Sequence, residues 1–144
     1  MAKEVSIFLE NKVGHFERIT SILKLNQINI LSMSLNDTVN GWGILNLLVN
    51  NPEKAFHALS DEGISVALRD VIAVEIEDEA GGLNELLQNV ARAKINFNNA
   101  YGRNIRENKT AILLLDVPDF QDSVSKLTEC GIEILPDEKV YGNL

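Results

Sequence analysis

The segment from Leu9 to Ile19, which reads LENKVGHFERI, carries polar groups that suit a small anion. Asn11, Lys12 and His15 can each donate a hydrogen bond to a carboxylate. A helix that begins near His15 leaves about four backbone N–H groups without internal partners, and their partial positive charge favours an anion. Gly14 lets a ligand approach the main chain because it has no side chain. We therefore predict a binding site at Asn11, Lys12, Val13, Gly14, His15 and Phe16.

A second turn of the same shape follows sixty-seven positions later, in the segment IEDEAGGLNEL. Asp78 and Glu79 in this turn would repel a carboxylate but attract an ammonium group. The first turn is therefore predicted to be the better carboxylate site, and the second to be weaker or degenerate. Alternatively, Gly14 and Gly81 only turn the chain. The residues predicted at the second turn are Asp78, Glu79, Ala80, Gly81, Gly82 and Leu83.

Residue patterns for other kinds of chemistry are missing from the sequence. The histidines, His15 and His57, belong to no Cys- or His-rich metal motif, and no glycine-rich phosphate loop occurs. Glu75 and Glu77 alternate along a strand, which predicts a solvated face, and Cys130 is predicted to be buried on a helical stripe. The serines cannot be grouped with a general base and a residue that orients it, so no catalytic nucleophile is predicted. We expect no metal, no cofactor and no catalytic residues, and therefore no enzyme.

The composition is that of an ordinary globular protein. The chain has 144 residues and a formal net charge of −8, which argues against binding to a phosphate backbone. The N-terminal segment lacks the run of about 20 apolar residues that a membrane span requires. A single cysteine cannot form an intrachain disulfide, and this fits a reducing compartment. We expect a soluble, cytoplasmic protein with no membrane or nucleic-acid partner.

The sequence repeats itself, because placing Gly14 on Gly81 aligns apolar positions along the whole chain. The same shift places the alternating residues Val5, Ile7 and Leu9 on Ile72, Val74 and Ile76. After one inserted residue it aligns Leu59, Gly63, Ile64 and Val66 with Leu127, Gly131, Ile132 and Ile134. We therefore predict two units, residues 1–70 and 71–144.

Each unit is predicted to fold in the order βαββαβ. In the first, alternation from Val5 to Leu9 indicates a strand, and residues 16–23 carry a helical stripe. Further strands over 31–35, 44–49 and 64–68 flank a helix that begins at Asn51-Pro52-Glu53 and ends at Gly63. The second unit repeats this order. Right-handed crossovers lead to an α+β, ferredoxin-like sandwich whose helices cover one face of an antiparallel sheet.

These features resemble the ACT domain, a βαββαβ module that binds amino acids or other small effectors. ACT domains carry an Asn or Asp and then a turn glycine where the first strand meets the first helix, as in ENKVGHF and EDEAGGL. The run Trp42-Gly43-Ile44-Leu45, entering the third strand, is similar as well. The chain departs from the family at Val13 and Ala80, where proline is common. The tandem arrangement resembles small double-ACT proteins.

The resemblance implies a regulatory sensor whose amino-acid effector lies between paired units, where a glycine turn meets an edge strand. Trp42 would be either a wall of that pocket or a residue that packs units together. Exposed edge strands favour a homodimer. The identity of the effector is left open, as is the regulated enzyme or other protein partner.

Two other interpretations stay open from the sequence. An RNA-recognition motif has the same βαββαβ order, and Gly41-Trp42-Gly43 matches part of its third-strand signature, but the basic residue and both later aromatics are missing. The other is a non-catalytic scaffold with empty turns. Arg103, Arg106 and Lys109 are predicted at a hairpin tip, where they are either solvated or in contact with an anion.

Overall fold

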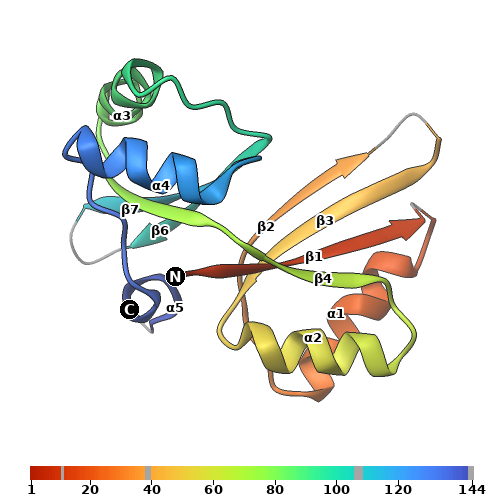
Figure 1. Cartoon of the computed structure of the whole chain (residues 1–144). Helices are drawn as coiled ribbons and strands as arrows, with labels where there is room; N and C mark the ends of the chain where they lie inside the picture. Colours follow the sequence, from red (N-terminus) through yellow and green to blue (C-terminus); the bar gives the residue numbers. More distant parts are fainter. Residues whose placement is uncertain (11, 38–39, 106–108, 143–144) are drawn as a thin grey trace. The chain divides into compact units, whose positions relative to one another are not determined.

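The computed structural model describes residues 1–10, 12–37, 40–105 and 109–142, and the chain divides into two compact units (Figure 1). The N-terminal unit is Lys3–Arg69, and the C-terminal unit consists of Met1–Ala2 with Asp70–Leu144. The Val71 N–H donates to the Ala2 carbonyl at 3.0 Å, and the Met1 ammonium pairs with Asp137 Oδ1 at 2.9 Å. The first two residues therefore belong to the second unit.

The N-terminal unit is a four-stranded sheet with two helices on one face. Its strands lie in the order β2-β3-β1-β4, and β3 pairs antiparallel with both β1 and β2. Asn51 begins the second helix as predicted, because its side chain accepts from the Lys54 N–H at 3.2 Å. The elements are β1 (Lys3–Glu10), α1 (His15–Leu25), β2 (Ile30–Asp37), β3 (Trp42–Val49), α2 (Pro52–Asp61) and β4 (Val66–Asp70).

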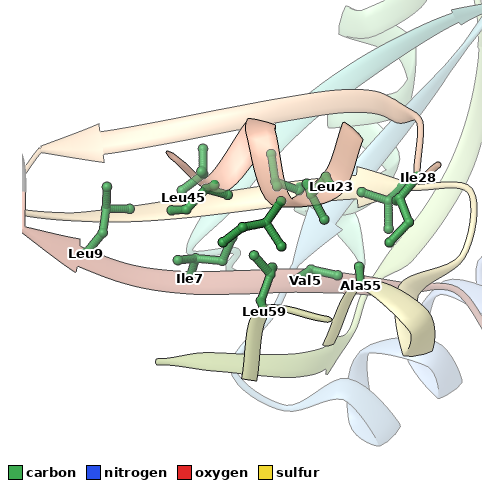
Figure 2. Close-up of a cluster of buried hydrophobic side chains, with 12 residues drawn as sticks. Val5, Ile7, Leu9, Leu23, Ile28, Leu45, Ala55 and Leu59 are labelled. Carbon is green, nitrogen blue, oxygen red and sulfur yellow. The ribbon is translucent and has the colours of Figure 1, made fainter. Parts of the chain in front are cut away.

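The core of this unit lies between the sheet and the two helices (Figure 2). Alternate residues of β1 point toward the helices, and Val5 and Ile7 are fully buried opposite Leu47 and Leu45 of β3. The other faces of β1 and β3 carry Phe8, Trp42 and Ile44, which are exposed. The period-two pattern thus predicted both the strand and its buried face.

The C-terminal unit repeats this layout with one strand fewer among its described residues. Its strands lie in the order β5-β7-β6, and all pairs are antiparallel. Leu86 and Val90 of one helix and Leu127 of the next pack against the same face of the sheet. The elements are β5 (Ile72–Glu77), α3 (Gly82–Arg92), β6 (Asn99–Ile105), β7 (Thr110–Asp116), α4 (Phe120–Glu129) and α5 (Asp137–Tyr141). The α+β, ferredoxin-like fold class is confirmed.

The final strand expected in the second unit does not form. Among the hydrogen bonds described for this segment, one joins it to the sheet: the Leu135 N–H donates to the Ala73 carbonyl at 2.8 Å. The chain then turns into α5. Pro136 explains the difference, because it occupies the position of Leu68, which lies inside β4. Proline has no N–H for the ladder and fixes φ, so the strand cannot continue through it.

Cys130 is exposed, so its predicted burial is wrong. The prediction extended the helical stripe three residues beyond Leu127. However, α4 ends at Glu129, and Cys130 is its C-cap, where its N–H donates to the Lys126 and Leu127 carbonyls. Gly131 then takes a φ of 79°, which turns the chain away. The helix ends before the cysteine can reach the core.

Arg103 lies inside β6 rather than at a hairpin tip. It pairs with Ile112, on the face of the sheet opposite to α3 and α4, and it is half-buried. Its guanidinium donates to the Val140 carbonyl and, at 2.7 Å, to the Gly142 carbonyl, so it holds the end of α5. Burial lowers the pKa of the Arg103 guanidinium from its usual value. Lys109 is exposed, and Arg106 lies outside the described residues.

No helix in the described part of the chain is both long enough and apolar enough to cross a membrane.

We expect Arg103→Ala to lower the free energy of unfolding by about 1–3 kcal/mol, because two charge-assisted hydrogen bonds to carbonyl groups are lost. Urea titration followed by circular dichroism measures the change. Arg92→Ala is the matched control, since Arg92 is an exposed arginine in the last turn of α3 and should cost less than about 1 kcal/mol. Equal losses in the two variants would contradict a clamping role for Arg103.

Candidate functional site

Gly14 joins β1 to α1 in a left-handed conformation, with φ of 90° and ψ of −16°. This region is disfavoured for residues with a Cβ, so glycine fits here for conformational reasons. The His15 N–H donates to the Lys12 carbonyl at 3.2 Å, and the Arg18 N–H donates to the Gly14 carbonyl at 3.0 Å. The turn is therefore tight, and α1 begins directly after it.

The first turn of α1 keeps backbone donors available. No hydrogen bond from the Phe16 or Glu17 N–H to any described residue is present, and Gly14 offers no side chain as a cap. A Cβ placed on Gly14 would meet no atom within 4 Å, so there is room beside the turn. These amides and this space are what an anion site at a helix N-terminus requires.

A hollow of about 340 Å³ lies next to this turn. Its walls come from the end of β1, the first turns of α1, the start of β3 and the segment that leads into β4. The rings of Phe8 and Trp42 stack with centroids 4.9 Å apart and form an aromatic wall. The remaining lining residues are Leu9, Glu10, His15, Arg18, Ile19, Gly63, Ile64 and Ser65.

The His15 ring is held at the edge of the hollow. Its Nδ1 lies 2.9 Å from the Glu10 carbonyl oxygen. A carbonyl can only accept, so Nδ1 carries the proton and Nε2 of the neutral ring is an acceptor. The predicted role of His15 as a group beside the ligand therefore stays a prediction, with the ring orientation now defined.

Arg18 is one of the lining residues that the sequence did not predict as part of the site. Its Nη2 donates to the Glu62 carbonyl at 3.2 Å and lies 3.9 Å from a Glu62 carboxylate oxygen. Because both contacts use Nη2, the remaining guanidinium N–H groups have no partner among the described residues. Arg18 follows Gly14 by four positions, one helical turn, and this spacing could have identified it.

Several predicted residues of the first turn lie outside the hollow. Lys12 pairs with the Glu10 carboxylate at 2.8 Å, and the Val13 side chain is fully exposed. Phe16 is half-buried and packs against the core, so the aromatic wall comes from Phe8 and Trp42 instead. Asn11 lies outside the described residues.

The second turn has the same backbone as the first. Gly81 has φ of 91° and ψ of −10°, and its carbonyl accepts from the Glu85 N–H at 3.0 Å. Asp78, Glu79 and Ala80 are exposed, and Leu83 is 46% exposed. The duplication therefore preserves the glycine conformation in both units.

The two turns differ at the residue after the glycine. A Cβ on Gly82 would lie 2.1 Å from the Glu77 carbonyl oxygen, a distance that no side chain can adopt. His15 occupies the corresponding position in the first unit, where there is space for a ring. The second helix thus begins closer to the end of its strand, and Gly82 is required for packing.

A second hollow of about 280 Å³ lies beside the second turn. Glu75, Glu77, Glu85 and Glu133 contribute to its lining, and its apolar residues are Ile76, Leu86, Ile132 and Leu135. A broader depression of about 590 Å³ follows α1 and the start of β2, away from both turns. Its lining carries Glu17 and Lys24 but no aromatic side chain, so we do not assign a ligand to it.

The described residues hold no group of three or more His, Cys, Asp or Glu side chains placed to bind a metal ion. His57 is exposed, and its ring contacts Phe56 edge to face with centroids 5.5 Å apart. The polar groups that could contact a ligand at the two turns are therefore backbone amides, Arg18, His15 and carboxylates.

Comparisons with known proteins agree with this architecture. A family model described as an ACT domain pair matches residues 1–133. The crystal structure of protein BT0572 from Bacteroides thetaiotaomicron is 26% identical, with a TM-score of 0.85 over 99% of this chain and 96% of that one. None of the curated proteins compared with the sequence matches it.

Two further crystal structures share the fold at lower sequence identity. The regulatory subunit of aspartate kinase from Thermus thermophilus, in its ligand-free form, is 11% identical, with a TM-score of 0.62 over 89% of this chain and 91% of that one. The corresponding subunit from Thermus flavus is 12% identical, with a TM-score of 0.56 over 90% and 92% of the two chains.

We expect Gly82→Ala to destabilise the protein by about 1–3 kcal/mol, because the new methyl group overlaps the Glu77 carbonyl and forces the backbone to move. His15→Ala is the matched variant at the equivalent position and should cost less than about 1 kcal/mol, since an exposed hydrogen bond alone is lost. Thermal and urea unfolding of both variants measures the difference. A Gly82→Ala protein as stable as the wild type would contradict the close approach at the second turn.

Proposed function

Because this chain belongs to the ACT domain family, we propose that it is a regulatory protein that binds an amino acid or similar small effector in the hollow beside Gly14. The observation that carries the proposal is the combination at one turn of open space, helix amides without a partner among the described residues, and a cationic side chain. The volume, about 340 Å³, lies at the small end of the roughly 300–1,000 Å³ typical of ligand pockets. A single amino acid suits this size.

The carboxylate of the effector would lie at the start of α1. An anion at a helix N-terminus gains about 0.3–1 kcal/mol from the helix dipole, and about 2 kcal/mol in partly buried geometry. This is too little for tight binding, so side chains must add contacts. Arg18 supplies further donors on the same side of the helix, and His15 lies beside it.

The rest of the effector would use the other walls. Glu10 lines the hollow, and its carboxylate, which pairs with Lys12 at 2.8 Å, would also attract an ammonium group. The stacked rings of Phe8 and Trp42 offer an apolar surface, which supports an effector with an apolar or aromatic body. We infer that Trp42 is a wall of the pocket rather than a residue that only packs units together.

The effector would regulate rather than react. Binding would order the turn. If the effector binds more tightly when the turn contacts another unit, it stabilises that paired state, and such a difference in affinity is the minimal requirement for regulation. We propose that an edge strand of a further ACT unit completes the site, that the protein forms homodimers, and that it acts on a partner enzyme in the cytoplasm without catalysis of its own. The exposed thiol of Cys130 fits a reducing compartment.

The two alternatives from the sequence are weaker. The family match is to ACT domains rather than to RNA-recognition motifs. Phe8 and Trp42 do lie on the open face of the sheet, but their rings stack parallel on each other and the net charge of −8 opposes a phosphate backbone. A scaffold whose turns stay empty differs from the proposal in one respect only, the absence of a bound effector.

A thermal-shift screen of the twenty amino acids, each at millimolar concentration, tests the proposal. A ligand at ten times its Kd stabilises the folded state by about 1.4 kcal/mol, which raises Tm by about 3–6 °C for a chain of this size. Calorimetric titration of the hit against Gly14→Asp should show at least a tenfold weaker affinity, because a carboxylate is placed where the effector's carboxylate binds.

Gly14→Asn is the matched control. It has the shape of Gly14→Asp without the charge, and both residues tolerate left-handed backbone angles better than others do. Gly14→Asn should therefore retain more binding than Gly14→Asp. Absence of stabilisation by every amino acid would favour the empty scaffold, and equal loss from Gly14→Asp and Gly81→Asp would refute the ranking of the two turns.

A further inference from the structure

The two hollows beside the glycine turns are copies of one pocket. Shifting the chain by the repeat length carries Phe8, Arg18 and Ile19 of the first hollow onto Glu75, Glu85 and Leu86 of the second. After the single inserted residue, Ile64 and Ser65 fall on Ile132 and Glu133. These positions line the pocket in both units, so the duplication preserved its shape as well as its turn.

The second pocket is more acidic than the first, although three aliphatic positions were kept. Leu9, Ile19 and Ile64 remain aliphatic in the second copy, as Ile76, Leu86 and Ile132. Three other positions become acidic, with Glu75 in place of Phe8, Glu85 in place of Arg18 and Glu133 in place of Ser65. Glu10 and Glu77 are equivalent lining positions that carry a negative charge in both copies.

An anionic ligand meets different charges in the two pockets. Two unit charges about 4 Å apart interact with roughly 4 kcal/mol in surroundings like a protein surface, attractive or repulsive according to sign. The first lining carries Arg18 and the Glu10 carboxylate, and the Glu62 carboxylate lies 3.9 Å from Arg18 Nη2. The second lining contains four glutamates and no lysine or arginine. A carboxylate can therefore pair with Arg18 in the first pocket, whereas the charged side chains of the second pocket all repel it.

We infer that Arg18 anchors the carboxylate of the effector, and that its replacement by Glu85 confines carboxylate binding to the N-terminal unit, with one effector per chain. This inference rests on the proposed function and names the residue that determines its specificity. The helix amides cannot make this distinction, because Gly14 and Gly81 have the same conformation in both turns.

The geometry around Arg18 suits this role. Arg18 lies in the first turns of α1 and lines the hollow. Its Nη2 donates to the Glu62 carbonyl beyond α2 at 3.2 Å, and this hydrogen bond limits the conformations of the side chain. The other guanidinium nitrogens keep donors that can form the paired hydrogen bonds typical of arginine with a carboxylate. Lys24, on the same helix, is an exposed cation outside this pocket.

Calorimetric titration with each hit of the amino-acid panel, and with its carboxamide, tests the assignment. The carboxamide lacks the negative charge and should bind at least tenfold more weakly to the wild-type protein. Arg18→Lys, Arg18→Gln and Arg18→Glu should weaken binding of the free acid in that order, and Arg18→Gln should cost roughly 10- to 100-fold, the usual effect of removing a charged hydrogen bond. Lys24→Glu introduces the same change of charge on the same helix and should bind like the wild type.

The stoichiometry gives a second measurement that does not depend on any variant. Wild-type protein should bind one carboxylate ligand per chain, whereas two equivalent sites per chain would overturn the inference. If Gly14→Asp abolishes binding but Arg18→Glu binds as tightly as Lys24→Glu, the role of Arg18 is wrong and the proposed function stands. If no amino acid binds the wild-type protein, both are overturned.

Discussion

The left-handed backbone of Gly14, and of Gly81 in the second unit, directs each first strand into its helix and fixes where the helix amides point. The two glycines agree within a few degrees, with φ of 90° and 91°. A residue with a Cβ is strained in this region, so the constraint acts on the turn whether or not a ligand binds. The sheet and helices then follow from ordinary apolar patterning on either side. Binding chemistry is added around a turn that the fold already requires.

Because the constraint is structural, the glycines alone say little about function, and the differences between the two copies say more. The first turn leaves space for His15, while the second presses Gly82 against the Glu77 carbonyl. The first pocket carries Phe8 and Arg18, and the second carries Glu75 and Glu85 at the equivalent positions. Duplication gave two copies of one frame, and substitutions at a few lining positions made the second pocket more acidic than the first.

Local patterns in the sequence predicted most of the fold but only part of the candidate site. Alternation in β1, the cap at Asn51 and the repeat itself are local or periodic signals, and the structure confirms them. The last strand predicted in the second unit does not form, because Pro136 occupies the position of Leu68. Cys130 is exposed rather than buried, because α4 ends at Glu129. The hollow depends on Ser65 lying beside Phe8, with a hydrogen bond from the Phe8 N–H to the Ser65 carbonyl of 3.1 Å. Such long-range contacts are not visible in a single segment, which is why Phe8 was missed, whereas the helical spacing of Arg18 from Gly14 is a local signal that was available in the sequence.

The pairing of Ala2 with Val71 and of Met1 with Asp137 makes the C-terminal unit discontinuous along the chain. During synthesis on the ribosome, Lys3–Arg69 emerges as one uninterrupted segment and can fold while the remainder is still being made. The other unit combines Met1–Ala2 with Asp70–Leu144. Its assembly is therefore completed only when translation has reached α5, so the half with the carboxylate-attracting pocket is built first.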